Sequence, residues 1–172
     1  ASAGTAAPES PQREAVLAAL NGVMGDRLAA SANPFATRMT LRFQGTEVLP
    51  QAPPAQLAAS RKALLLIHGL CMNDLQWQTE HDGQPFDHGA LLGAALGASP
   101  MYLRYNSGRH ISDNGADLSN LLEQLLARPN NRLEQLTVVA HSMGGLVIRS
   151  ALHQAGRRGL RWPKVLKAIV FL

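Results

Sequence analysis

Continuous apolar runs and helically spaced apolar residues alternate along most of the chain. Runs typical of strands that are buried on both faces of a parallel sheet occupy residues 63–67 and 136–140, and residues 101–105 and 167–172 also fit strands. The segments between these strands carry apolar residues at helical spacing. This alternation predicts an α/β fold in which a mostly parallel sheet has helices on both faces.

Three helices are predicted between these strands. Asp87 suits the N-cap of a short leucine-rich helix, and a later helix over residues 144–155 is expected to end at Gly156. The clearest helix has leucines at i, i+3, i+4, i+7 and i+8, with Asp117 in its first turn and Pro129 as its stop. These leucines are Leu118, Leu121, Leu122, Leu125 and Leu126.

The first sixty residues are organised differently. Ser10 followed by Pro11 predicts the start of an N-terminal helix, and its apolar residues fall on one stripe. Residues 39–48 alternate as a hairpin or a pair of short strands would, and the proline-rich stretch 50–60 reads as a connector. We therefore divide the chain into an N-terminal part, 1–60, and an α/β core, 61–172. The residues of the stripe are Val16, Leu17, Leu20, Val23 and Met24.

Length and charge narrow the classes of function. With 172 residues, 46% of them hydrophobic, the chain fits one globular domain. It carries 16 Lys and Arg against 12 Asp and Glu, and the excess lies after Ser142, where no carboxylate occurs. We interpret these charges as a solvated helix end and loop, and we expect no nucleic-acid partner.

Several chemistries lack the residues that they need. Cys71 is the only cysteine, which excludes an internal disulfide and a zinc site built from several thiolates. No apolar run approaches the roughly 18 residues of a transmembrane segment, and no signal-peptide layout or nucleotide-binding glycine motif occurs. The sequence therefore predicts no cofactor, no metal and no transmembrane segment, and it leaves the cellular compartment open.

The segment 139–146 lies between a predicted strand and a predicted helix, so the chain must turn sharply at Ser142. A turn this tight strains the serine backbone by on the order of 1–3 kcal/mol and requires small residues two positions away. Ala140 and Gly144 meet that requirement. Such a turn exposes the hydroxyl above the sheet and leaves the backbone N–H of Met143 able to bind an oxyanion. We therefore predict Ser142 as a nucleophile with a positive φ angle.

This turn and the Ile-His-Gly-Leu motif at 67–70 resemble the α/β-hydrolase superfamily, and residues 64–172 look like the N-terminal two-thirds of its fold. Ala140 stands where the usual Gly-x-Ser-x-Gly pattern begins with glycine, a variant that recurs in bacterial lipases. Together with the stretches 70–73 and 105–110, the motifs resemble the lipase and GPI-inositol-deacylase-like esterase branch.

The resemblance implies a serine hydrolase that cleaves carboxylic esters, with a lipid or other acyl ester as its substrate, through an acyl-serine intermediate. In this family the residue after His-Gly donates the second oxyanion N–H, which here is Leu70. The candidate catalytic residues are thus Ser142, Leu70 and Met143. We expect His68 to brace this loop rather than to act as a base.

A complete catalytic triad cannot be assembled from this sequence. The superfamily order is nucleophile, acid, histidine, yet no Asp or Glu follows Ser142 and the only later histidine, His153, lies three helical turns away. The side chain of His141 leaves the turn in another direction. Upstream of Ser142, one histidine–carboxylate pair and one cluster of histidines and carboxylates are weaker candidates for the base and the acid. We interpret the cluster as solvated loop residues rather than as a metal site. The pair is His110 with Asp113, and the cluster is His81 with Asp82, Asp87 and His88.

Our leading hypothesis is the N-terminal part of a serine ester hydrolase whose acid and histidine lie beyond Leu172. A further segment or a partner chain would then pair with the final apolar strand, whose edge is otherwise exposed. Two alternatives stay open: an acyltransferase on the same scaffold, and a non-catalytic module that uses the strand edge for binding or assembly.

Overall fold

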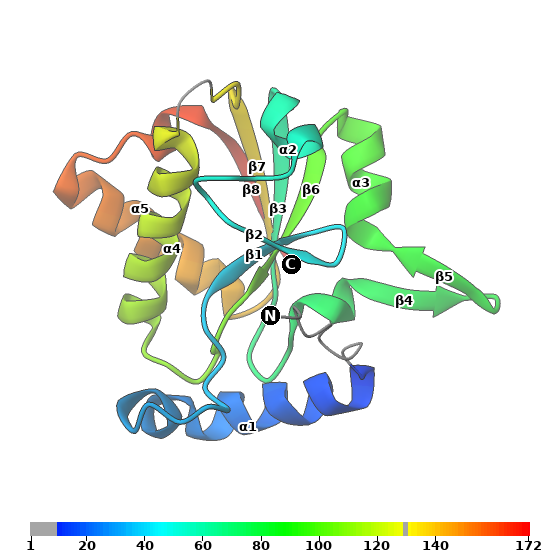
Figure 1. The fold of residues 1–172 in the computed structure, drawn as a ribbon, viewed down its shortest axis with the longest axis vertical. Coiled ribbons are helices and arrows are strands. Elements are labelled where there is room, and N and C mark those ends of the chain that lie inside the picture. Colours follow the sequence, from blue (N-terminus) through cyan, green and yellow to red (C-terminus); the bar gives the residue numbers. More distant parts are fainter. Residues whose placement is uncertain (1–9, 129–130) are drawn as a thin grey trace, which may run out of the picture.

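A computed structural model describes residues 10–128 and 131–172, and within these ranges the chain forms a six-stranded sheet in the order β2-β1-β6-β3-β7-β8 (Figure 1). Its strands are β1 Thr40–Phe43, β2 Thr46–Val48, β3 Lys62–Ile67, β6 Ser99–Arg104, β7 Gln135–Ala140 and β8 Leu166–Phe171. A separate hairpin joins β4 Gln78–His81 to β5 Gln84–Asp87. The helices are α1 Pro11–Ala30, α2 Ala55–Ala59, α3 His88–Leu96, α4 Ile111–Ala127 and α5 Gly144–Arg158, with 3-10 helices at Asp74–Trp77 (η1) and Trp162–Val165 (η2).

The middle of the sheet is parallel, and β3 is buried on both faces, whereas β8 at the edge is largely exposed. β6, β3, β7 and β8 run parallel to one another, and β1 and β2 extend the β6 edge in antiparallel pairing. Leu65 and Ile67 of β3 join the core cluster that includes α4 and α5, whereas Leu64 and Leu66 pack on the opposite face with Trp77. The predicted α/β fold with a mostly parallel sheet is therefore confirmed. The continuous apolar run of β3 matches its burial on both faces.

Helices cover the two faces unequally. Figure 1 shows α4 and α5 on one side of the sheet and α3 on the other, while α1 crosses the lower end of the strands. The carboxylate of Asp87 caps α3 as predicted, since it accepts a hydrogen bond from the N–H of Ala90 at 2.8 Å. Among the described residues, no helix is long and apolar enough to cross a bilayer.

Several predicted boundaries were wrong. The stretch 50–60 holds the short helix α2 rather than only a connector. α4 begins at Ile111, so Asp117 lies beyond its first turn, which Asp113 occupies instead. Gly156 lies inside α5, and the helix ends at Arg158, followed by Gly159 with a left-handed backbone (φ 64°). The predicted helix stop at Pro129 lies outside the described residues.

The predicted apolar stripe of α1 does not face the core. Val16 is 68% exposed and Val23 is 80% exposed. The helix instead buries a face of small and polar residues, because that face lies against the loops that follow β3 and β6, where the two backbones approach closely. The buried residues are Glu14, Ala18, Asn21, Gly25 and Leu28.

The orientation of α1 can be tested with a matched pair of substitutions. Ala18→Asp places a larger, charged side chain in the buried contact of α1 and should lower the free energy of unfolding by at least about 2 kcal/mol. Val23→Asp adds the same side chain to the exposed face of the same helix and should change it by no more than about 0.5 kcal/mol. Urea unfolding followed by circular dichroism measures both, and equal losses would show that the apolar stripe is buried.

Candidate active site

The turn between β7 and α5 has the backbone expected of a strained serine. Ser142 has φ 51°, so the predicted positive φ is present. Its side chain is exposed, and α5 begins two residues later at Gly144. A non-glycine residue in this region is strained by about 1–3 kcal/mol, so the surrounding structure must hold it in place.

Three backbone contacts hold this turn. The N–H of Ser142 donates to the carbonyl of Leu172 at 2.8 Å, and the N–H of His141 donates to the carbonyl of Ile67 at 2.9 Å. A Cβ on Gly144 would lie 2.8 Å from the carbonyl oxygens of both Ile67 and His68, so no larger residue fits there without movement. The turn is therefore wedged against the end of β3 and tied to the end of β8.

The structure brings the predicted Leu70 loop to Ser142. A Cβ on Gly69 would lie 3.2 Å from the Cβ of Ser142, so these two backbones meet at the carboxyl ends of adjacent parallel strands. Among the described residues, the backbone N–H groups of Leu70 and Met143 donate to no hydrogen bond. The residues that carry these two N–H groups thus directly follow Gly69 and Ser142, whose backbones meet.

His68 is fixed inside the molecule. Its ring stacks on Tyr105 with centroids 4.3 Å apart, and its Nδ1 lies 2.9 Å from the carbonyl oxygen of Gly69. The Tyr105 hydroxyl donates to the carbonyl of His68 at 2.7 Å. Burial lowers the pKa of His68 to about 4 and raises the pKa of Tyr105, so both rings are neutral near pH 7. These contacts brace the loop that carries Leu70.

None of the other candidate histidines contacts the serine. His153 is exposed on α5, and His110 pairs with Asp26 of α1 at 3.4 Å rather than with Asp113. His81 pairs with Asp82 in an exposed position on the β4–β5 hairpin. Within the described residues, no histidine is hydrogen-bonded to the Ser142 hydroxyl, so the triad is incomplete there.

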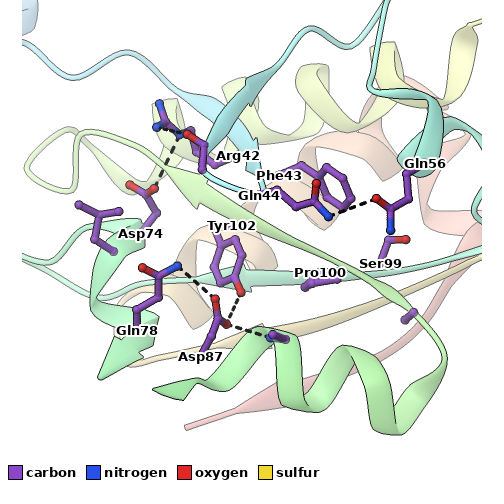
Figure 2. Close-up of a pocket in the computed structure, with 14 residues that line it drawn as sticks. Arg42, Phe43, Gln44, Gln56, Asp74, Gln78, Asp87, Ser99, Pro100 and Tyr102 are labelled. Carbon is purple, nitrogen blue, oxygen red and sulfur yellow. Dashed lines mark hydrogen bonds and ion pairs between the residues drawn. The ribbon is translucent and has the colours of Figure 1, made fainter. Parts of the chain in front are cut away.

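A pocket of about 300 Å³ lies at another part of the molecule, lined by residues of β1, η1, β6 and α3 (Figure 2). Its carboxylates are already paired: Asp87 accepts from the Gln78 amide at 3.1 Å and from the Tyr102 hydroxyl, and Asp74 lies 3.9 Å from Arg42. Burial, together with the bond to Asp87, raises the pKa of Tyr102. The pocket contains none of Ser142, Leu70 and Met143, and of the weaker upstream candidates Asp87 lines it.

Sequence reasoning missed Ser107 and the contact of α1 with the site. The Ser107 hydroxyl accepts a hydrogen bond from the N–H of Cys71 at 3.0 Å, which joins the loop after β3 to the loop after β6. α1 packs on both loops through Gly22 and Gly25. Two glycines one turn apart in a helix were the available signal, because they permit close backbone approach.

Comparison with known proteins identifies the family to which the chain belongs. Residues 60–172 match the family described as putative serine esterase (DUF676), which is more than half of the chain, so the chain belongs to that family. The match is to serine esterases in general and does not specify the GPI-inositol-deacylase branch. No curated protein matches the sequence.

Similar solved structures include two of the Bacillus licheniformis lipase BlEst2. The propeptide form is 19% identical with a TM-score of 0.49, over 64% of this chain and 22% of that one. The mature form is 16% identical with a TM-score of 0.48, over 70% of this chain and 44% of that one. This chain therefore spans less than half the length of either lipase structure.

The buried His68 predicts a dependence of stability on pH. Its pKa is about 4 in the fold and 6.5 ordinarily, so the unfolded chain binds more protons between these values. The stabilisation is complete above about pH 6.5 and is lost as the pH falls toward 4, which amounts to about 2 kcal/mol between pH 7 and pH 5. Urea unfolding at both pH values should show this loss in the wild type and in His110→Gln, an exposed control. If His68→Gln kept the same loss, another group would be responsible.

Proposed function

We propose that this chain carries the nucleophile and the oxyanion donors of a serine hydrolase that acts on carboxylic esters, with a lipid or other acyl ester as its substrate. The observation that carries the proposal is Ser142 itself, exposed at φ 51° between β7 and α5. Membership of a serine esterase family supports the same chemistry. An acyl-serine route uses no cofactor, and it gives each of the predicted residues a role.

In the proposed reaction the Ser142 oxygen attacks the carbonyl carbon of the ester while its proton passes to a general base. The carbonyl oxygen becomes an oxyanion, which accepts hydrogen bonds from the N–H groups of Leu70 and Met143. The C–O bond to the alcohol then breaks, the alcohol takes the proton, and an acyl-serine remains. Water hydrolyses that ester by the same steps and frees the hydroxyl.

The general base and its acid come, in this proposal, from a further segment or a partner chain that pairs with β8. β8 has β7 as its neighbour in the sheet, and Val170, Phe171 and Leu172 are exposed at its end. A strand added at this edge would cover the apolar residues, and the loops after it would lie at the same end of the sheet as Ser142. An acyltransferase would share every step except that an alcohol or amine acceptor replaces water.

Substitution of the serine tests the nucleophile. In the form of the protein that hydrolyses esters, Ser142→Ala should lower kcat/KM for a short-chain p-nitrophenyl ester by about 10³-fold or more, because no other group can form the acyl intermediate. A fluorophosphonate probe should label the wild type at Ser142 and leave the variant unlabelled. Ser112→Ala, an exposed serine in the first turn of α4, serves as the control. Unchanged hydrolysis by Ser142→Ala would disprove the assignment.

The need for a completing segment is tested by measuring the 172-residue chain alone and together with any segment that the native gene encodes after Leu172. The chain alone should be sparingly soluble and nearly inactive, because it lacks the base and leaves β8 uncovered. Addition of the segment should restore ester hydrolysis and probe labelling together. Robust turnover by the mass-verified chain alone would contradict this, and absence of labelling in either form would favour the non-catalytic module.

A further inference from the structure

α1 lies outside the region that matches the serine esterase family, yet it packs on the candidate active site. The family match begins at residue 60, whereas α1 spans Pro11–Ala30. In Figure 1 the helix crosses the end of the sheet where the loops after β3 and β6 emerge. Those loops carry Leu70 and Ser107, so the helix covers the backbone that the proposed oxyanion site uses.

The closest contact joins Gly22 of α1 to Cys71, the residue directly after Leu70. A Cβ on Gly22 would touch the Cys71 thiol and would lie 2.9 Å from the Cα and 3.0 Å from the N of Cys71. Cys71 has a left-handed backbone (φ 58°), and its N–H is bound to Ser107. The peptide after Leu70 is therefore enclosed between α1 and the β6 loop.

A second contact joins α1 to the β6 loop itself. The Asn106 amide donates to the carbonyl of Gly25 at 3.1 Å, and a Cβ on Gly25 would lie 2.7 Å from the Cα of Gly108. A Cβ on Gly108 would in turn lie 2.8 Å from the carbonyl oxygen of Gly22. The two backbones touch here, so neither can shift without moving the other.

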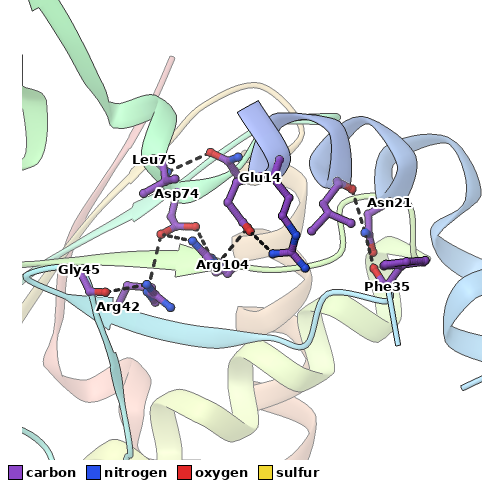
Figure 3. A network of polar contacts seen from close by, with 11 residues as sticks. Glu14, Asn21, Phe35, Arg42, Gly45, Asp74, Leu75 and Arg104 are labelled. Atoms are coloured by element: carbon purple, nitrogen blue, oxygen red, sulfur yellow. Dashed lines mark hydrogen bonds and ion pairs between the residues drawn. The ribbon is translucent and has the colours of Figure 1, made fainter. Parts of the chain in front are cut away.

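Polar contacts fix the helix on either side of these glycines. Toward the N-terminus, Glu14 pairs with Arg104 of β6 at 3.4 Å, and Arg104 pairs with Asp74 of η1 at 2.6 Å (Figure 3). On the other side, Asp26 accepts a hydrogen bond from the N–H of His110 at 3.1 Å. α1 is therefore anchored to β6 on one side of its contact with Cys71 and to the N-terminus of α4 on the other.

We propose that α1 is a positioning element of the active site, in which the Gly22–Cys71 contact sets the position of the Leu70 N–H. The proposal rests on the proposed function, because it assigns Leu70 as an oxyanion donor. Gly22 is a positioning residue, since it acts through Cys71 and touches no substrate. A displaced donor stabilises the transition state less well while leaving ground-state binding largely intact.

The test compares two helical glycines in the form of the protein that hydrolyses esters. Gly22→Ala should lower kcat by about tenfold or more and leave KM within about twofold, since small displacements of a donor affect the transition state most. Gly156→Ala is the matched control, because it makes the same change inside α5, where a new Cβ meets no atom within 4 Å. Gly22→Ala combined with Cys71→Ala should recover part of the lost kcat, because the substitution removes the thiol that the new methyl group contacts.

A second readout is independent of activity. Cys71 is the only cysteine in the chain, so its rate of reaction with a small thiol reagent reports on the contact with α1. Gly22→Ala should raise that rate at least about threefold under native conditions, whereas Gly156→Ala should leave it unchanged. If Gly22→Ala does not fold, Asp26→Ala replaces it: this side chain is half exposed, and its removal takes away the acceptor of the His110 N–H, so the variant should show faster thiol reaction and a two- to threefold lower kcat.

The outcomes separate this proposal from the one on which it rests. If Ser142→Ala abolishes hydrolysis but Gly22→Ala keeps both kcat and the thiol rate of the wild type, α1 has no positioning role and the proposed function stands. If Gly22→Ala raises kcat and KM together, the helix restricts substrate access and the positioning proposal is wrong. If Ser142→Ala retains full hydrolysis, the proposed function itself fails, and the thiol rate alone then reports whether α1 holds the Cys71 loop.

Discussion

The left-handed backbone at Ser142 is the constraint to which the neighbouring elements conform. A serine in that conformation is strained by about 1–3 kcal/mol, so it persists only where the surroundings allow no relaxation. Here the carbonyls at the end of β3 leave room for no side chain at Gly144, and the carbonyl of Leu172 binds the serine N–H. The sheet order places β3 and β8 on the two sides of β7, so both neighbours of β7 contact the turn that holds Ser142.

Much of the core could be predicted because a single signal determined each element. A strand buried on both faces requires a continuous apolar run, and residues 63–67 and 136–140 show one. The boundary of α5 was less certain, since Gly156 and Gly159 both suit a helix end and only the left-handed backbone of the second decides between them. The β4–β5 hairpin is largely exposed and lacks an apolar alternation, so its signal was the turn dipeptide Asp82-Gly83, in which both residues have positive φ.

The N-terminal helix shows where sequence patterns stop being informative. Its apolar spacing correctly predicted a helix, but the spacing shows only which residues share a face and not what that face contacts. The face with Val16 and Val23 is exposed, and the helix packs through Ala18, Gly22 and Gly25. The small size of these residues lets α1 approach the loops after β3 and β6 closely. Those loops lie far away in the sequence, so the spacing within α1 does not reveal the contact. For the same reason Ser142 could be identified from local residues, whereas Ser107 could not.

The bond between the Ser142 N–H and the Leu172 carbonyl couples the serine to the end of an edge strand, β8. Edge strands open more readily than central strands. The free energy of such local opening can be several kcal/mol lower than that of global unfolding. Each time the end of β8 opens, the serine turn loses an acceptor that holds its backbone. A strand bound along β8 would suppress this opening. Occupancy of the sheet edge and order at the serine are thus thermodynamically linked, and each would strengthen the other even if the bound strand contributed no catalytic group.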